Sequence, residues 1–337
     1  MKIAFFEIEN WEQVSLEKSL QNHQVTFHNF PLTSANADLA ADADIVSIFI
    51  YSKIDAEVLA KLSQVKLITT RSMGFDHIDL TLTKERNILT CNVPAYGERT
   101  VAEHTFALIL ALSRKVMAAY DRTEKMNFDY HGLTGFDLQG KTIGIIGGGR
   151  IGINVAKIAL NGFEMKALVY DASPKPELAT ELGFTYTTLE DLLSQSDIIS
   201  IHAPYMPATH HLINQKNIGL IKKGALLINT ARGGLLETQA LLQALQEGRL
   251  AGAGLDVLEE ECTIREESEI MSKDFSDKCN LATVLQNHLL IARNDVIITP
   301  HIAFNSKEAL EKILSTTVET IQAFEKGQTI NQIKPRV

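Results

Sequence analysis

TIGIIGGGRIG, residues 142–152, is the stretch that decides the fold of this chain. Its apolar first half predicts a short buried strand. Gly147, Gly149 and Gly152 then follow the G-x-G-x-x-G spacing of a phosphate-binding turn that opens a helix. Gly147 permits the tight turn, Gly149 lets the backbone approach a pyrophosphate, and Gly152 lets the helix pack on the strand. The free N–H groups and the dipole of that helix favour the anion, so the motif predicts a dinucleotide site.

A second strand strengthens this interpretation. MKALVYD, residues 165–171, delivers Asp171 roughly 20 residues after the last glycine, where a carboxylate accepts the adenosine ribose hydroxyls. An acidic residue at that position repels a 2′-phosphate. The sequence therefore predicts NAD rather than NADP, although a glycine-rich turn followed by a surface aspartate is the plainer alternative.

Composition limits the class of protein. A chain of 337 residues that is 45% hydrophobic and 22% charged is long and apolar enough for two globular domains. Its net charge of -9, without long runs of like charge, argues against a nucleic-acid partner. Three cysteines without a C-x-x-C pair indicate reduced thiols in a cytoplasmic protein. Neither a signal peptide nor a membrane span is expected, because the apolar runs are too short.

Short apolar runs alternate with helical periodicity along the whole chain, which is typical of parallel sheets covered on both faces. The fold class is therefore α/β, with two parallel-sheet domains. The strands expected in the first domain are 2–6, 24–30, 44–50 and 66–70, and those expected in the second are 142–146, 165–171, 197–203, 225–231, 252–258 and 295–300.

Two long helices are expected outside this alternation. Residues 100–120 are apolar nearly all round, which predicts one long buried helix that links the domains or forms a subunit interface. Residues 306–327 are amphipathic and end at a glycine, which predicts a helix that returns to the first domain.

Three polar residues stand at or just beyond strand ends in the second half, where open α/β sheets place their ligands. Arg232 follows 225–231, Glu261 follows 252–258, and His301 follows 295–300. Taken singly, each has a plain alternative: a surface ion pair, a solvated acidic run and a hydrogen-bonded loop histidine. Their joint placement beside a dinucleotide site favours catalysis.

Reduction of a 2-oxo acid needs these three residue types together. The carbonyl oxygen gains negative charge during hydride transfer and must receive a proton, which a histidine supplies near neutral pH. A carboxylate such as that of Glu261 favours the charged imidazole of His301. A fixed Arg232 holds the substrate carboxylate and stabilises the developing charge.

The ordered motifs GIIGGGRIG, SIHAP, NTARGG, GLDVLEEE and TPHIAF resemble those of the D-isomer-specific 2-hydroxyacid dehydrogenases. RSMGFDHID (71–79) and NVPAYGERTVAEH (92–104) are similar to the substrate loop and hinge of that family, so the resemblance covers nearly the whole chain. It implies a substrate domain of 1–98 plus 303–337, flavodoxin-like in its sheet, into which a Rossmann-like NAD domain of 99–302 is inserted. It also implies a homodimer built on the NAD domain.

The resemblance assigns roles residue by residue. Arg232, Glu261 and His301 fall on the catalytic set of the family, and the amides around Ser72, Met73 and Gly74 fall where the substrate carboxylate binds. His202 suits a supporting role at the cofactor because it follows the strand DIISI. The remaining cofactor-binding positions implied are Val101, Arg150, Ile151, Thr230, Ala231 and Asp256, the last of which matches the residue that holds the nicotinamide carboxamide.

Details favour the D-lactate dehydrogenase branch of the family. Tyr51, Tyr96 and Phe304 are similar to residues of that branch, which puts aromatic groups near the substrate. Such a pocket suits pyruvate or a larger unphosphorylated 2-oxo acid such as phenylpyruvate, with hydroxypyruvate and glyoxylate as further alternatives. Each aromatic residue could equally serve packing alone.

One departure from the branch is the long interval between Glu261 and His301. Residues 262–290 form an insertion whose role as a partial lid or as surface decoration the sequence leaves open. Glu259 and Glu260 adjoin Glu261, so the identity of the acid also stays open. Mutation of each glutamate to glutamine would decide it.

The sequence also bears on functions other than a dehydrogenase. His210 and His211 are adjacent but lack companion ligands, so no metal site is expected. A NAD-sensing, corepressor-like protein would share this fold and could keep the catalytic residues. Formate oxidation would share the cofactor fold but has no use for an acid-paired histidine.

Overall fold

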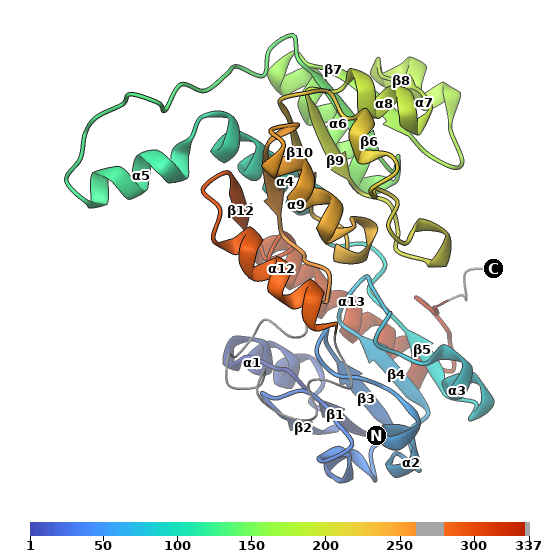
Figure 1. Ribbon diagram of the computed structural model, residues 1–337. Helices are drawn as coiled ribbons and strands as arrows, with labels where there is room; N and C mark the ends of the chain where they lie inside the picture. The colour runs from blue at the N-terminus through green and yellow to red at the C-terminus, as the bar shows by residue number, and fades with distance from the viewer. Residues whose placement is uncertain (261–279, 334–337) are drawn as a thin grey trace. The chain divides into compact units, whose positions relative to one another are not determined.

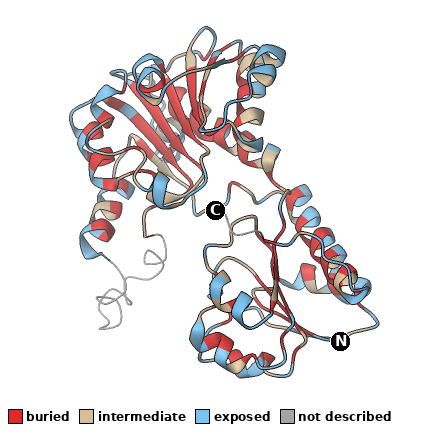
Figure 2. Cartoon of the chain, turned by 90° about the vertical axis from the view of Figure 1, so that its right-hand side faces the viewer, coloured by how far each residue is buried: buried red, intermediate tan, exposed pale blue. Residues whose placement is uncertain are grey.

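The computed structural model describes residues 1–260 and 280–333. The chain forms two compact units, one built from Met1–Gly97 with Asn305–Val337 and the other from Glu98–Phe304. We call them unit 1 and unit 2 and describe each by itself. Figure 2 shows that the central strands of both units are buried and that their helices keep an exposed outer side. Among the described residues, no helix is both long and apolar enough to cross a membrane.

Unit 1 is a five-stranded parallel sheet with the order β2-β1-β3-β4-β5. Its central strands β3 and β4 are short apolar runs buried on both faces, as is typical of parallel sheets, whereas the edge strand β2 is partly exposed. The topology reverses between β1 and β3, so the carboxyl ends of these two strands form its switch point. The strands are β1 Lys2–Phe5, β2 Gln24–Phe27, β3 Ile45–Ile48, β4 Leu67–Thr70 and β5 Leu89–Cys91.

Helices cover both faces of the sheet in unit 1. On one face, α1 (Asn10–Ser19) and α13 (Lys307–Glu325) contribute apolar side chains that pack on β1, β3 and β4. On the other, η1 (Ala37–Ala40) and α2 (Ala56–Lys61) close a second core. The short helix α3 (Leu80–Glu85) precedes β5. Side-chain caps begin three of these helices, because Asp55, Asp79 and Ser306 accept hydrogen bonds from first-turn N–H groups.

Unit 2 is a seven-stranded parallel sheet with the order β12-β11-β10-β9-β6-β7-β8. β6 pairs with β7 on one side and with β9 on the other, so Ile146 lies opposite both Tyr170 and Ile201. The switch point therefore lies between β6 and β9. The strands are β6 Thr142–Ile146, β7 Lys166–Tyr170, β8 Thr185–Tyr186, β9 Ile198–Ile201, β10 Ala225–Asn229, β11 Leu250–Leu255 and β12 Val296–Ile298.

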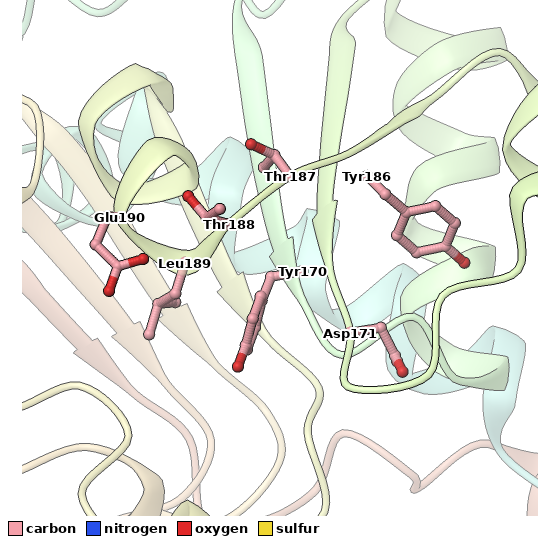
Figure 3. A pocket seen from close by; sticks show the side chains of 7 residues that line it. All are labelled: Tyr170, Asp171, Tyr186, Thr187, Thr188, Leu189 and Glu190. Atoms are coloured by element: carbon pink, nitrogen blue, oxygen red, sulfur yellow. The ribbon is translucent and has the colours of Figure 1, made fainter.

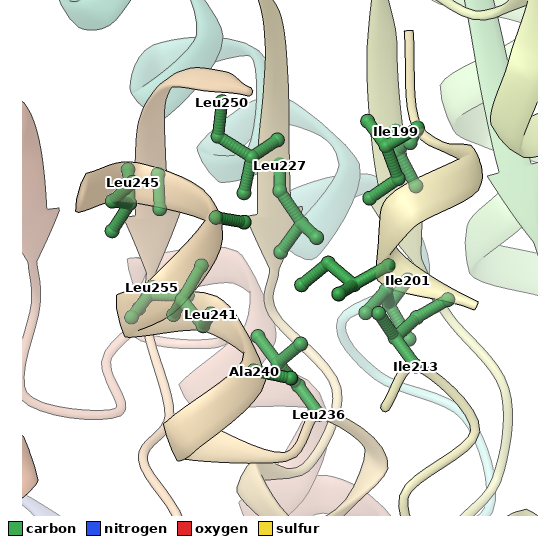
Figure 4. Packing of buried hydrophobic residues seen from close by; sticks show 14 of the residues in the cluster. Ile199, Ile201, Ile213, Leu227, Leu236, Ala240, Leu241, Leu245, Leu250 and Leu255 are labelled. Carbon is green, nitrogen blue, oxygen red and sulfur yellow. The ribbon is translucent and has the colours of Figure 1, made fainter. Parts of the chain in front are cut away.

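Two cores sandwich this sheet. On one face, α4 (Glu98–Ser113) and α6 (Arg150–Phe163) pack their small and aromatic residues against β6, β7 and β10. On the other, leucines of α9 (Thr238–Gln246) pack on β10 and β11, as Figure 4 shows for Leu241, Leu245, Leu227 and Leu255. The remaining helical elements are α7 Pro176–Leu182, α8 Leu189–Gln195, η2 Pro207–Thr209, η3 Ile218–Leu220, η4 Gly233–Leu235 and α12 Leu281–Ile291.

The two-sheet α/β class expected from the sequence is confirmed, but three elements differ from expectation. The prediction of one long helix over 100–120 is wrong. Lys115 adopts a left-handed φ of 55° and interrupts the helix, so the segment forms two helices, α4 and α5 (Val116–Glu124). None of the described residues of α5 is buried. Strands β5 and β8 were not expected, since three-residue and two-residue strands carry too little periodicity to recognise.

We call residues 116–135, which start with α5, the arm of unit 2. Arg122 Nη1 donates to the carbonyls of Asp129 and His131, which folds the arm on itself. The arm closes where the Phe136 N–H donates to the Ser113 carbonyl, and an added Cβ on Gly135 would lie 2.1 Å from that oxygen. Figure 1 shows α5 and the following loop standing away from the sheet of unit 2.

Candidate functional site

The glycine turn lies at the switch point of unit 2. Gly147 has a φ of 103°, which only glycine adopts readily, and a Cβ there would lie 2.6 Å from Ala203 N. A Cβ on Gly152 would lie 2.0 Å from the Gly147 carbonyl oxygen, so the helix can pack this closely only without a side chain. A Cβ on Gly149, the N-cap of α6, would meet no atom within 4 Å. The turn thus has the close packing and the open side of a phosphate cradle.

Asp171 closes the other side of the turn. Its Oδ2 accepts the Gly148 N–H at 2.6 Å and its Oδ1 accepts the Ser173 N–H at 2.7 Å. These two bonds use about half of the acceptor capacity of a carboxylate. The residue therefore fixes the glycine turn and retains further acceptor positions.

A cavity of about 510 Å³ opens beside Asp171. Its lining comes from the end of β7, from β8 and from the start of α8, as Figure 3 shows. Tyr186, Thr187 and Thr188 belong to this lining and were missed by the sequence analysis. The run TYTT could have suggested them only if strand β8 had been recognised.

His202 lies at the end of β9, beside the glycine turn. Its Nε2 is 2.8 Å from Ser200 Oγ, whereas its buried Nδ1 has no protein partner. Burial lowers the pKa of His202 to about 3, so the ring is neutral at physiological pH.

The turn that carries Arg232 is held by its own strand. Asn229, buried at the end of β10, donates from Nδ2 to the Arg232 carbonyl at 2.9 Å and accepts the Ala231 N–H at its Oδ1. Thr230 Oγ1 lies 3.1 Å from Thr105 Oγ1 of α4. The Arg232 side chain is partly exposed, with Nη1 donating to the Ala231 carbonyl.

Asp256 is fully buried at the end of β11 and holds the turn that contains His301. Its Oδ1 accepts Thr299 Oγ1 at 2.5 Å and the Ile302 N–H at 2.9 Å, and its Oδ2 accepts the Ala303 N–H at 2.8 Å. The His301 N–H donates to the Asp256 carbonyl at 2.9 Å. His301 itself has a left-handed φ of 55°. This carboxylate therefore bonds the His301 turn in this structure, while its expected contact with a carboxamide stays a prediction.

His104 of α4 reaches the same cluster. Its Nε2 is 3.1 Å from Thr299 Oγ1 and 3.5 Å from Asp256 Oδ1. Thr299 was not singled out from the sequence, because a threonine before a proline carries no pattern of its own. The ends of β10, β11 and β12 are neighbours in the sheet, so Arg232 and His301 flank Asp256 in the strand order.

The three glutamates after β11 differ in their contacts. Glu259 is engaged by His211 and Thr238, and Glu260 accepts the Asn280 N–H at 2.7 Å. Glu261, the expected acid partner of His301, lies outside the described residues, as do positions 262–279 of the expected insertion. Its positions 281–290 belong to α12.

In unit 1, the loop with Ser72, Met73 and Gly74 is fixed from several sides. Ser72 Oγ donates to the Gly74 carbonyl at 2.6 Å and lies 2.7 Å from Thr70 Oγ1, and Asn92 Nδ2 donates to the Met73 carbonyl at 2.8 Å. Tyr51, with 49% of its surface exposed, and the partly exposed Tyr96 lie in the same unit. Unit 1 thus gathers all expected substrate-binding residues except Phe304.

The remaining expected residues belong to unit 2. Arg150 begins α6, and its Nη1 lies 3.3 Å from Glu98 Oε1 at the start of α4. Ile151 is partly buried, Val101 of α4 is buried, and Phe304 is partly exposed at the end of the unit. Within the part of the chain that the structure describes, no group of three His, Cys, Asp or Glu side chains is arranged to hold a metal.

Comparisons with known proteins agree with this geometry. Residues 106–303 match the family model described as D-isomer specific 2-hydroxyacid dehydrogenase, NAD binding domain. A 2-hydroxyacid dehydrogenase homolog from Zymomonas mobilis is 37% identical over 97% of this chain and 98% of its own length. For the D-lactate dehydrogenase of Escherichia coli, the values are 36%, 98% and 98%. The structure of an Aquifex aeolicus D-lactate dehydrogenase complexed with NAD and lactic acid superposes with a TM-score of 0.85 at 39% identity, covering 96% of each chain.

Proposed function

Because the chain belongs to the D-isomer-specific 2-hydroxyacid dehydrogenases, we propose that it is a D-lactate dehydrogenase that reversibly reduces pyruvate to D-lactate. Family membership makes it an NAD-dependent oxidoreductase of D-2-hydroxy acids. Its relatives named for D-lactate match over nearly the full length, which supports lactate as the hydroxy acid. The proposed mechanism rests on one observation above all: the buried Asp256 carboxylate accepts hydrogen bonds from the two residues that follow His301.

The residues present fit NAD. Gly147 and Gly152 pack as a phosphate turn needs, Gly149 leaves room, and Asp171 keeps acceptor positions for the ribose. When bound, the nicotinamide supplies or receives the hydride.

His301 is proposed as the acid and base. During reduction it gives a proton to the carbonyl oxygen, and during oxidation it removes the proton from the hydroxyl. Asp256 fixes this histidine through three backbone bonds, since it accepts from Ile302 and Ala303 and receives the His301 N–H at its carbonyl. Glu261 is proposed to pair with the ring and favour its charged form.

Arg232 and the loop of Ser72, Met73 and Gly74 are proposed to bind the substrate. The guanidinium of Arg232 offers a planar fork that suits a carboxylate and stabilises charge on the neighbouring oxygen. Backbone N–H groups of the loop would bind the same carboxylate. Tyr51, Tyr96 and Phe304 are proposed to line the side-chain end of the substrate.

We propose a cytoplasmic homodimer that is formed by the arm of unit 2. Met117, Tyr120, Met126, Phe128 and Tyr130 expose between 53% and 80% of their surface on this one segment. An ordered arm with so many exposed apolar side chains is typical of a surface that another chain covers. Phe128→Asp should shift the mass measured by light scattering from dimer to monomer, and an unchanged mass would refute this arm as the interface.

The substrate is tested by following NADH oxidation at 340 nm with pyruvate, longer aliphatic 2-oxo acids, phenylpyruvate, hydroxypyruvate, glyoxylate and 3-phosphohydroxypyruvate. Pyruvate should give the highest kcat/KM, and His301→Ala should abolish turnover. A higher kcat/KM for another acid would move the assignment to that substrate. Tight NADH binding without any turnover would instead support a NAD-sensing protein.

A further inference from the structure

Three side chains form a hydrogen-bonded cluster behind the Arg232 turn. His211 Nε2 lies 2.6 Å from Glu259 Oε1, and Thr238 Oγ1 donates to Glu259 Oε2 at 2.8 Å. We call His211, Glu259 and Thr238 the His211 clamp. It joins three segments of unit 2 that are distant in sequence: the connection after β9, the start of α9 and the connection after β11. None of its members has a role in the chemistry proposed above.

The clamp contacts the Arg232 turn through its own backbone. The His211 N–H donates to the Gly234 carbonyl at 2.8 Å. A Cβ on Gly233 would lie 2.0 Å from the Leu258 carbonyl oxygen and 2.4 Å from Glu259 N, so these two backbones are in direct contact. His211 therefore bonds the backbone of Gly234, and the backbone at Leu258 and Glu259 packs directly against Gly233.

Further contacts fix the clamp itself. Asn287 of α12 is fully buried and donates from Nδ2 to the Glu259 carbonyl at 2.8 Å. His210 stacks on His211 with ring centroids 3.8 Å apart. The side chains of His211 and Glu259 are only 29% and 17% exposed, so their hydrogen bond is stronger than that of a surface pair. Rigid support of this kind suits the placement of a binding group.

We propose that the His211 clamp is a positioning device for Arg232. It fixes Gly233 and Gly234, and thereby sets the direction in which the guanidinium of Arg232 meets the substrate carboxylate. A bidentate bond tolerates little misplacement, so loss of the clamp weakens binding of the 2-oxo acid before it affects the fold. The inference rests on the proposed function of Arg232.

The test compares His211→Leu, which removes the ring donor, with His211→Gln, which keeps an N–H donor for Glu259. His131→Leu is the matched control, because it removes another histidine–carboxylate pair of unit 2, the one that His131 makes with Asp129 in the arm. In His211→Leu, the KM for pyruvate should rise about tenfold, while the KM for NADH stays nearly constant. His211→Gln should recover most of the loss. A lower Tm without a change in the KM for pyruvate, or equal rises for both substrates, would refute the positioning role.

A second readout separates this inference from the proposed activity. The Leu235 and Leu236 N–H groups donate to the carbonyls of Arg232 and Gly233, so their hydrogen exchange reports on the turn. By mass spectrometry, exchange in a peptide covering 232–236 should quicken in His211→Leu and remain as in the unmodified protein in His131→Leu. A peptide covering 142–146 should not change. If no 2-oxo acid is turned over, the proposed function fails, yet unchanged exchange in 232–236 would still overturn the clamp.

Discussion

The switch points of the two sheets share a topology but differ in what fills them. Between β1 and β3 of unit 1, the Glu7 carboxylate accepts the N–H groups of Phe49, Tyr51 and Ser52. Arg71, 1% exposed, donates to the carbonyls of Phe6 and Glu7. Side chains of the chain itself thus satisfy the strand ends.

Between β6 and β9 of unit 2, glycines stand where unit 1 has charged side chains. Gly149 faces open space, since a Cβ there would meet no atom within 4 Å. Backbone N–H groups at such an open helix N-terminus are available to an anion. The comparison teaches that a parallel sheet offers a site at its switch point only where its own side chains do not close it.

The largest effect should come from a substitution at the strand ends of unit 2 where His301 lies. His301→Gln should lower kcat by about 10²–10⁴-fold, the usual contribution of a positioned acid and base. His28→Gln changes a histidine at the corresponding strand ends of unit 1 and should leave kcat nearly unchanged. Steady-state NADH oxidation measures both. An equal loss of kcat in the two variants would contradict a special role for the strand ends of unit 2.

Removal of a side chain that closes the switch point of unit 1 should lower the stability of that unit. Arg71→Met removes the guanidinium that lies 3.9 Å from Glu12 and bonds two carbonyls, which should destabilise unit 1 by about 3–5 kcal/mol. Trp11 is the single tryptophan of the chain and belongs to unit 1, so its fluorescence during urea unfolding reports on this unit. An unchanged urea midpoint would mean that the buried guanidinium of Arg71 does not stabilise unit 1.

The open switch point should distinguish its glycines. In Gly152→Ala, the new Cβ meets the Gly147 carbonyl, so unit 2 should lose about 1–3 kcal/mol of stability together with NADH affinity. In Gly149→Ala, the Cβ meets no protein atom, so thermal stability should be kept while NADH affinity falls about tenfold, or 1.4 kcal/mol. Calorimetry of unfolding and NADH titration measure the two effects. Unaltered affinity in Gly149→Ala would show that this side of the turn receives no phosphate.

The last effect concerns acid stability. Because burial lowers the pKa of His202 from 6.5 to about 3, the unfolded state binds more protons than the folded state between these values. The contribution of His202 to stability is therefore complete above pH 6.5 and declines as the pH falls toward 3. His202→Gln should flatten the fall in Tm between pH 6.5 and 4.5, and an equally steep fall in the variant would contradict this.

Much of unit 2 could be predicted from the sequence, because its signals are local. The glycines at 147, 149 and 152 and the acid at 171 are defined by spacing along one βαβ unit, and the structure places them around one turn. The break at Lys115 could not be predicted, since apolar periodicity continues through it. Tyr186 was missed because the strand that carries it has only two residues.

The contacts of acidic residues show the same limit. From the sequence, Glu261 was the expected acid, with its neighbours Glu259 and Glu260 left open as alternatives. Only the fold shows that Glu259 bonds to His211 and Thr238. Similarly, the pattern around Asp256 indicated a cofactor contact, whereas the fold reveals its bonds to the turn of His301.

The sequence by itself determined the two parallel sheets, the dinucleotide turn and the residue types of the proposed chemistry, because strand periodicity, glycine spacing and family motifs are properties of neighbouring residues. Only the tertiary structure decided which strand ends are closed by Arg71 and Glu7 and which glutamate is already bonded. It also decided how the Arg232 and His301 turns are held. These features depend on hydrogen bonds between segments far apart in the chain, and a buried donor or acceptor takes whichever partner the fold brings to it.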